Sequence, residues 1–180
     1  ASDFSVLKLS CILEEVFMDN NAVCGVCFHH CLLADGQKGL CHGRINKNGN
    51  VVPCNYGEIT SVALDPIEKK PLSFYHPASY VLSVGSYGCN MRCFFCRNHG
   101  ISQASEADVN SEYVPAQKLS AMAKGLVPKG NIGVAFTYNE PLISYEYIID
   151  VSSILKKDSL KTIVVSNGMI VPQTARKILP

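Results

Sequence analysis

Three cysteines in one short segment have the spacing to hold a metal or iron–sulfur centre together. Cys89, Cys93 and Cys96 are spaced C-x3-C-x2-C and come directly after the apolar run 80–84, which predicts a strand. The carboxyl end of a strand is where parallel sheets and barrels place their sites. Structural zinc sites and [4Fe–4S] clusters ordinarily take four protein ligands, so three thiolates would leave one iron of a cube open to another ligand. The alternative is three buried core cysteines or half of a zinc knuckle.

A second group of cysteines comes earlier in the chain and contains four thiols. Its spacing is C-x2-C-x3-C-x9-C, formed by Cys24, Cys27, Cys31 and Cys41. Four thiolates complete a tetrahedron with no open position, so structural zinc is the first expectation and a second iron–sulfur cluster is the alternative. Buried or disulfide-bonded cysteines are a further reading. The side chains that could replace a thiol are those of His29, His30 and His42.

Composition indicates a globular protein with a substantial core. The chain has 180 residues, of which 47% are hydrophobic and 17% are charged, and its formal net charge is +1. That charge shows no bulk attraction to nucleic acid. The sequence contains no apolar run of membrane-spanning length and no secretory signal, so we expect a cytoplasmic protein without a membrane segment. Nine cysteines then indicate metal ligands in a reducing compartment and not a disulfide framework.

The elements that must position these cysteines form two parts. We expect residues 1–78 to be a Cys-rich metal-binding module with a helix at 5–18, short strands at 51–54 and 57–64, and an extended surface linker at 65–72. Residues 79–180 alternate strands and helices, which predicts an α/β fold with a parallel sheet or barrel. The expected elements are strands at 80–84, 132–137 and 162–166, and helices at 115–127, after Pro141 and from about Pro172. We therefore expect residues 79–180 to form the first half of a partial (βα) barrel, up to its third βα unit.

The cysteine triad, with an aromatic Phe95 before Cys96, resembles the signature of the radical S-adenosylmethionine (SAM) superfamily. The resemblance implies a [4Fe–4S] cluster on Cys89, Cys93 and Cys96, with SAM chelating the fourth iron. It also implies reductive cleavage of SAM to methionine and a 5′-deoxyadenosyl radical, which abstracts hydrogen from a substrate. Phe95 would pack near the adenine.

The ends of the next two predicted strands fit the same chemistry. Asn139-Glu140-Pro141 is similar to the superfamily segment Gly-Gly-Glu-Pro, which implies that Asn139 and Glu140 orient the SAM amino group. A carboxylate is a suitable partner for an ammonium group. Ser166 and Asn167 could hydrogen-bond the ribose or carboxylate of SAM. Taken alone, residues 139–141 would be a turn before a helix, and residues 166–168 would be an ordinary Asn-Gly turn.

A narrower resemblance covers nearly the whole chain from about residue 22. The stretches that carry it are the block 24–31, the run 37–41, Tyr56-Gly57, residues 64–72, the triad and residues 137–141. Together they look like radical SAM enzymes of the AmmeMemoRadiSam group, which are similar to pyruvate formate-lyase activating enzyme. The chain departs from that pattern at residues 97–100, Arg-Asn-His-Gly, which the resemblance implies to be on the substrate side of the site.

This resemblance implies a radical SAM oxidoreductase served by an electron donor such as flavodoxin or ferredoxin. Its substrate would be a protein, as in glycyl-radical activation, or alternatively RNA or a small molecule. The rival class is a non-catalytic zinc-binding interaction module in which both cysteine groups are structural.

Overall fold

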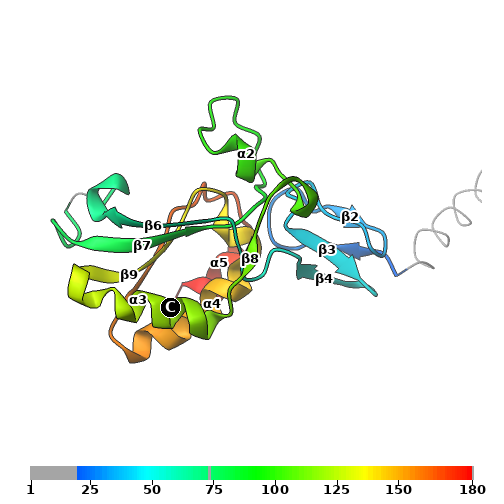
Figure 1. Ribbon diagram of the computed structural model, residues 1–180. Coiled ribbons are helices and arrows are strands. Elements are labelled where there is room, and N and C mark those ends of the chain that lie inside the picture. Colours follow the sequence, from blue (N-terminus) through cyan, green and yellow to red (C-terminus); the bar gives the residue numbers. More distant parts are fainter. Residues whose placement is uncertain (1–19, 73, 180) are drawn as a thin grey trace, which may run out of the picture.

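The structure, a computed structural model, describes residues 20–72 and 74–179. The helix expected at 5–18, and Cys11 with it, lie outside the described residues. A small β-rich part, formed by the segments from β1 to β4, lies beside a larger α/β part (Figure 1).

The α/β part is built on a four-stranded sheet in the order β10-β9-β7-β6. Its strands are β6 (Ser61–Pro66), β7 (Tyr80–Gly85), β9 (Asn131–Phe136) and β10 (Lys161–Val164). β7, β9 and β10 are parallel, whereas β6 pairs antiparallel with β7. The crossovers between the parallel strands carry helices α3 (Ala116–Gly125) and α4 (Tyr145–Lys157). The three predicted strands and the two helices between them are therefore confirmed.

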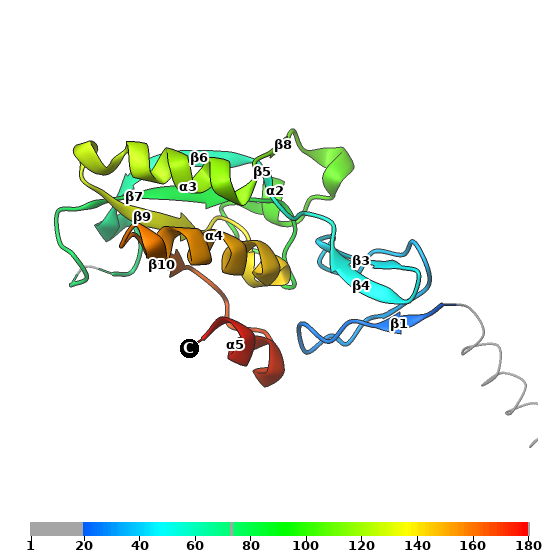
Figure 2. The ribbon, with the colours of Figure 1, turned by 90° about the horizontal axis from the view of Figure 1, so that it is seen from below.

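Helices α3 and α4 cover one face of this sheet (Figure 2). Their apolar side chains pack against the alternate residues Leu82, Val84, Val134 and Phe136 of the central strands. The helix residues in this core include Leu119, Ala123, Ile148, Val151 and Leu155. Alternation along the strands sends every second side chain to this face, so the remaining residues face the opposite side.

The opposite face is covered in part by the segment that follows β6. Ile67, at the start of the 3-10 helix η1 (Ile67–Lys69), packs with Val81, Ala135 and Ile163 and is fully buried. The prediction of an extended surface linker at 65–72 is therefore wrong. The side chains of Asp65 and Lys70 in that stretch are also buried, because their opposite charges form an ion pair.

The β-rich part consists of short antiparallel pairs. β1 (Ala22–Val23) pairs with β2 (Leu32–Leu33), and β3 (Arg44–Lys47) pairs with β4 (Asn50–Pro53). Asn48 and Gly49 between β3 and β4 both have positive φ, 51° and 81°, as a tight primed hairpin turn requires. β5 (Glu58–Ile59) pairs with β8 (Glu112–Tyr113), which follows the cysteine loop in the chain.

Short helices complete the described chain. They are α2 (His99–Ser102), η2 (Glu106–Asp108), η3 (Val127–Lys129), η4 (Pro141–Ser144) and α5 (Pro172–Ile178). The mixed α/β content is thus established, but the sheet is small and open, so the partial barrel stays a prediction. The division at residue 78 also stays a prediction; β6, before that point, already belongs to the sheet. Within the described ranges, no helix is long and apolar enough to cross a membrane.

Candidate functional site

The cysteine triad lies on the loop between β7 and α2, which projects from the carboxyl end of β7 (Figure 1). Cys89, Cys93 and Cys96 are free and partly exposed. The Met91 amide donates to the Cys89 sulfur at 3.4 Å, and the Cys96 sulfur lies 3.3 Å from the Ser102 hydroxyl. Burial raises the pKa of the Cys89 thiol, and the Met91 amide opposes that effect. The loop therefore presents three accessible sulfurs at one end of the sheet.

Asn139, at the end of β9, holds the beginning of this loop. Its side-chain oxygen accepts from the Ser86 amide at 3.2 Å. Its side-chain nitrogen donates to the carbonyl oxygens of Tyr87 and Gly88 at 3.2 and 3.0 Å. The predicted cofactor residue Asn139 thus uses its amide group to fix the segment that leads into Cys89.

Glu140 joins the ends of β9 and β10. It is 1% exposed, and its two carboxylate oxygens accept from the Leu142 amide, the Ser166 hydroxyl and the Asn167 amide at 2.7–2.9 Å. Burial raises the pKa of Glu140, and these hydrogen bonds oppose the rise. A carboxylate offers about four acceptor positions, so about one is left for a ligand. Glu140 also caps η4, so the helix-start interpretation holds alongside any role in binding.

Asn167 carries this network back to the triad. Its side-chain nitrogen donates to the side-chain oxygen of Asn90 at 2.9 Å and lies 3.8 Å from the Cys89 sulfur. Asn90 is 1% exposed and donates to the Met169 carbonyl at 2.7 Å. The structure therefore brings together Cys89 and four predicted cofactor residues: Asn139, Glu140, Ser166 and Asn167.

Phe95 lies apart from that network. Its side chain is 72% exposed and makes an edge-to-face contact with the 98% exposed ring of Phe94, with 5.1 Å between ring centroids. The predicted contact of Phe95 with adenine is not tested by this arrangement.

The four N-terminal cysteines gather in the β-rich part, where three of them are buried. The sulfurs of Cys31 and Cys41 each lie 3.8 Å from the position that a side-chain carbon at Gly39 would occupy. Burial raises the pKa of the Cys41 thiol to about 12. In the described part of the chain, no three His, Cys, Asp or Glu side chains converge closely enough for a single metal ion. The second metal site therefore stays a prediction.

A hydrogen bond between backbone groups joins the cysteine triad to the N-terminal group of four cysteines. The Cys89 amide donates to the Cys41 carbonyl at 3.1 Å, and a side-chain carbon at Gly88 would come within 2.4 Å of the same oxygen. Two side-chain contacts add to this junction: His29 Nε2 donates to the Asn90 carbonyl at 2.7 Å, and the Arg92 guanidinium to His42 Nε2 at 3.3 Å. The sequence predictions missed this junction; its one local signal is the glycine before Cys89.

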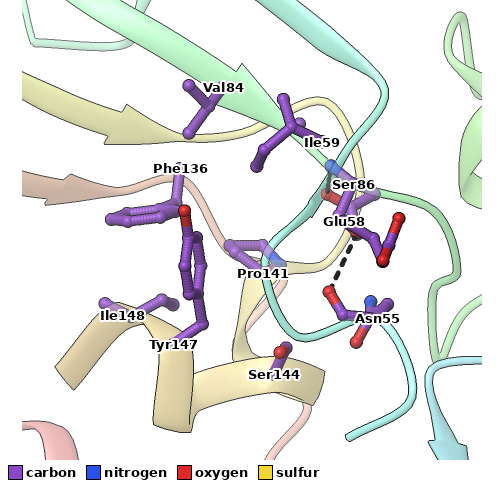
Figure 3. A pocket seen from close by; sticks show the side chains of 12 residues that line it. Asn55, Glu58, Ile59, Val84, Ser86, Phe136, Pro141, Ser144, Tyr147 and Ile148 are labelled. Carbon is purple, nitrogen blue, oxygen red and sulfur yellow. Dashed lines mark hydrogen bonds between the residues drawn. The ribbon is translucent and has the colours of Figure 1, made fainter. Parts of the chain in front are cut away.

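A small cavity lies between the end of β7 and helix α4 (Figure 3). It is lined by Asn55, Ser86, Phe136, Ser144 and Tyr147, among others. Its interior offers about 20 Å³ to the centre of a water molecule, which is room for one water. This cavity is far too small for SAM, and the cysteine sulfurs are not part of its lining.

The cysteine triad lies in the part of the chain that matches a known protein family. The family model described as "Radical SAM superfamily" matches residues 83–180, which include all three cysteines and the ends of β7, β9 and β10. An uncharacterized protein of Methanocaldococcus jannaschii, MJ0808, is 35% identical over 157 residues. The match covers 87% of this chain and 46% of that relative, so the chain spans about half the relative's length.

Proposed function

Because the chain belongs to the radical SAM superfamily, we propose that Cys89, Cys93 and Cys96 are the cluster ligands of a SAM-cleaving enzyme. Membership implies an enzyme that uses a [4Fe–4S] cluster and SAM. The observation that carries the ligand assignment is the loop of three free, partly exposed thiols at the carboxyl end of β7, inside the matched region.

The residues present fit such a cluster. Each thiolate of a cube binds a different iron, so the sulfurs do not need to meet at one point as the ligands of a single ion must. The Met91 amide already donates to the Cys89 sulfur, and amide donors of this kind tune cluster potentials. When bound, the cluster supplies the electron that splits SAM into methionine and a 5′-deoxyadenosyl radical.

The chain's own residues would then position SAM. The remaining acceptor position of Glu140 would receive the SAM ammonium, at a carboxylate whose orientation Ser166 and Asn167 hold. Asn139 would act by fixing the loop that carries Cys89. Ser166 and Asn167 would contact the ribose or carboxylate, and Phe95 would cover the adenine.

For the finer class we propose an AmmeMemoRadiSam-type enzyme similar to pyruvate formate-lyase activating enzyme. The sequence stretches that carry this resemblance support it, and the chain departs from the pattern at residues 97–100. Hydrogen abstraction would act on a protein, as in glycyl-radical activation, with RNA or a small molecule as the alternative. The fold would be a partial (βα) barrel of which this chain holds the first three units, preceded by a Cys-rich module at 1–78.

Three further features belong to the same proposal. Cys24, Cys27, Cys31 and Cys41 would bind a second metal, zinc before iron–sulfur, because four thiolates complete a tetrahedral site with no open position. Flavodoxin or ferredoxin would donate the electron. A cytoplasmic location suits the eight free cysteines of the described ranges, since a reducing compartment preserves thiols.

Anaerobic reconstitution of the full-length protein with iron and sulfide tests the function. A cluster gives broad visible absorption, and a strong reductant with SAM should then yield 5′-deoxyadenosine and methionine. The rival interaction module, with zinc in both cysteine groups, predicts colourless protein and no cleavage. Colourless protein that binds only zinc would overturn the assignment.

A further inference from the structure

Tyr138, two residues after the end of β9 and directly before Asn139, has a left-handed backbone. Its φ is +73°, a conformation that is uncommon for residues other than glycine and a genuine outlier for a bulky side chain. A strained backbone conformation persists only where surrounding contacts stabilise it, and such residues are most frequent at functional sites. The segment that follows Tyr138 is the one that carries Asn139 and Glu140.

The left-handed backbone changes the side of the sheet on which the tyrosine lies. Simple alternation would place residue 138 with Val134 and Phe136 on the face covered by helices. Instead, the Tyr138 hydroxyl donates to Asp65 at 2.9 Å. Asp65 is paired opposite Val81, whose side chain belongs to the other face. The ring therefore lies on the face away from α3 and α4.

Buried charges hold the ring there. Asp65 and Lys70 are each 5% exposed and form an ion pair at 3.1 Å, and Lys69 approaches the same carboxylate at 2.9 Å. The Lys70 ammonium also lies 5.1 Å from the centroid of the Tyr138 ring, within the range of a cation–π interaction. We call Asp65, Lys70 and Tyr138 the tyrosine clamp.

Gly85, the last residue of β7, makes room for the clamp. A side-chain carbon at Gly85 would lie 2.8 Å from Cδ2 of the Tyr138 ring and 3.1 Å from the Thr137 carbonyl. The ring therefore packs directly on the backbone from which the cysteine loop departs. Asn139, the next residue, bonds the same loop at residues 86–88.

We propose that Asp65 and Lys70 act through Tyr138 as positioning residues for SAM binding. The clamp holds the backbone of residue 138 in its strained conformation, and this aims Asn139 at the cysteine loop and Glu140 at Ser166 and Asn167. This inference rests on the proposed function for the identity of the ligand. It gives a role to the charged stretch 65–72, which the cluster chemistry alone does not use.

Tyr138→Phe tests the clamp, because it keeps the ring and removes the hydrogen bond to a charged carboxylate. In reconstituted full-length protein we expect about a tenfold or greater loss of SAM affinity with the iron content unchanged. Tyr56→Phe is the matched control, because the Tyr56 hydroxyl also donates to a carboxylate, that of Asp150 on α4. That control should bind SAM as the wild type does.

A second measurement needs neither the cluster nor SAM. The Asn167 amide donates to Glu140, so its hydrogen exchange in iron-free protein reports whether Glu140 is correctly placed. Exchange at residue 167 should be faster in Tyr138→Phe and unchanged in Tyr56→Phe. If Tyr138→Phe does not fold, Lys70→Met replaces it, since Lys69 still balances Asp65, and the same two changes are expected.

The outcomes separate the two proposals. Wild-type SAM affinity and wild-type exchange at residue 167 in the folded clamp variant, with only a lower melting temperature, would mean that the clamp merely stabilises the sheet. If the wild-type protein itself binds no SAM, the proposed function fails. Faster exchange at residue 167 would then still support the positioning of Glu140, and unchanged exchange would overturn it.

Discussion

The Cys89 amide donates a hydrogen bond to the Cys41 carbonyl, with 3.1 Å between nitrogen and oxygen. This bond joins a member of the cysteine triad to a member of the N-terminal group. The β-rich part therefore supports the backbone that presents the proposed cluster ligands. A substitution that displaces either partner of this hydrogen bond should therefore also disturb the other cysteine group.

Gly88→Ala should disturb this junction. Gly88 has φ +85°, and a methyl group would come within 2.4 Å of the Cys41 carbonyl oxygen. The left-handed conformation alone costs a side chain about 1–2 kcal/mol. We expect a lower free energy of unfolding in urea and less iron incorporated on reconstitution.

Gly125→Ala is the control for that substitution. Gly125 lies at the end of α3 with nothing within 4 Å of the added carbon. Alanine in a helix is favoured over glycine by roughly 0.5–1 kcal/mol, so this variant should be at least as stable as the wild type and should load iron normally. Normal iron loading in Gly88→Ala would show that the junction does not shape the cysteine loop.

Cys93→Ala should abolish both the cluster absorption and the cleavage of SAM. Two thiolates cannot hold a cube that already has one open iron. Cys54→Ala is the matched control, because Cys54 is a partly buried free thiol of the same chain outside both groups. Cleavage at the wild-type rate in Cys93→Ala would refute the ligand assignment.

The N-terminal group should keep its own metal when the triad is removed. In the variant with alanine at Cys89, Cys93 and Cys96, we expect about one zinc per chain and almost no iron. Retention of about four irons per chain and of the brown colour of an iron–sulfur cluster would instead assign a second cluster to this group. A protein without any metal would mean that these thiols are core or disulfide residues.

Glu140→Gln should weaken SAM binding while the iron content stays the same. Loss of a charge-assisted hydrogen bond, about 1.5–3 kcal/mol, corresponds to a loss of affinity of roughly ten- to hundredfold. The amide also replaces an acceptor with a donor opposite the amides of Leu142 and Asn167, so the melting temperature should fall. Equal affinities for SAM in a titration of both forms would leave Glu140 with a structural role alone.

The clamp should make stability depend on pH in the acid range. Burial by itself raises the pKa of Asp65, but hydrogen bonds from Lys69, Tyr138 and Lys70 outweigh it and hold the pKa well below its usual range. The folded-state pKa is thus below the unfolded value of 3.8, so this stabilisation is present above pH 3.8 and is lost as the pH falls below it.

Urea unfolding of iron-free wild type and Asp65→Asn measures this contribution. The difference in free energy of unfolding between the two should be larger at pH 6 than at pH 3. A difference that is the same at both pH values would show that the Asp65 carboxylate is not stabilised by its neighbours in the folded protein.

The sequence by itself determined the local features of the site. The spacing of Cys89, Cys93 and Cys96 and the apolar run before them predicted a thiol loop at a strand end, and the loop after β7 confirms its position. Apolar periodicity was sufficient for β9, α3 and α4, because alternation and helical repeat are properties of neighbouring residues.

Only the tertiary structure decided what the charged and strained residues do. Asp65 and Lys70 lie in a stretch whose charges and prolines predicted a surface, yet both are buried. Each is paired with the opposite charge of the other, and Asp65 also accepts a hydrogen bond from Tyr138, 73 positions away in the sequence. The left-handed turn at Tyr138 depends on that distant partner, and the bond from Cys89 to Cys41 joins two segments that no local pattern relates. Local patterns record which residues are apolar and at what interval, whereas the compensation of a buried charge or a strained backbone depends on which distant groups the fold brings within a few ångströms.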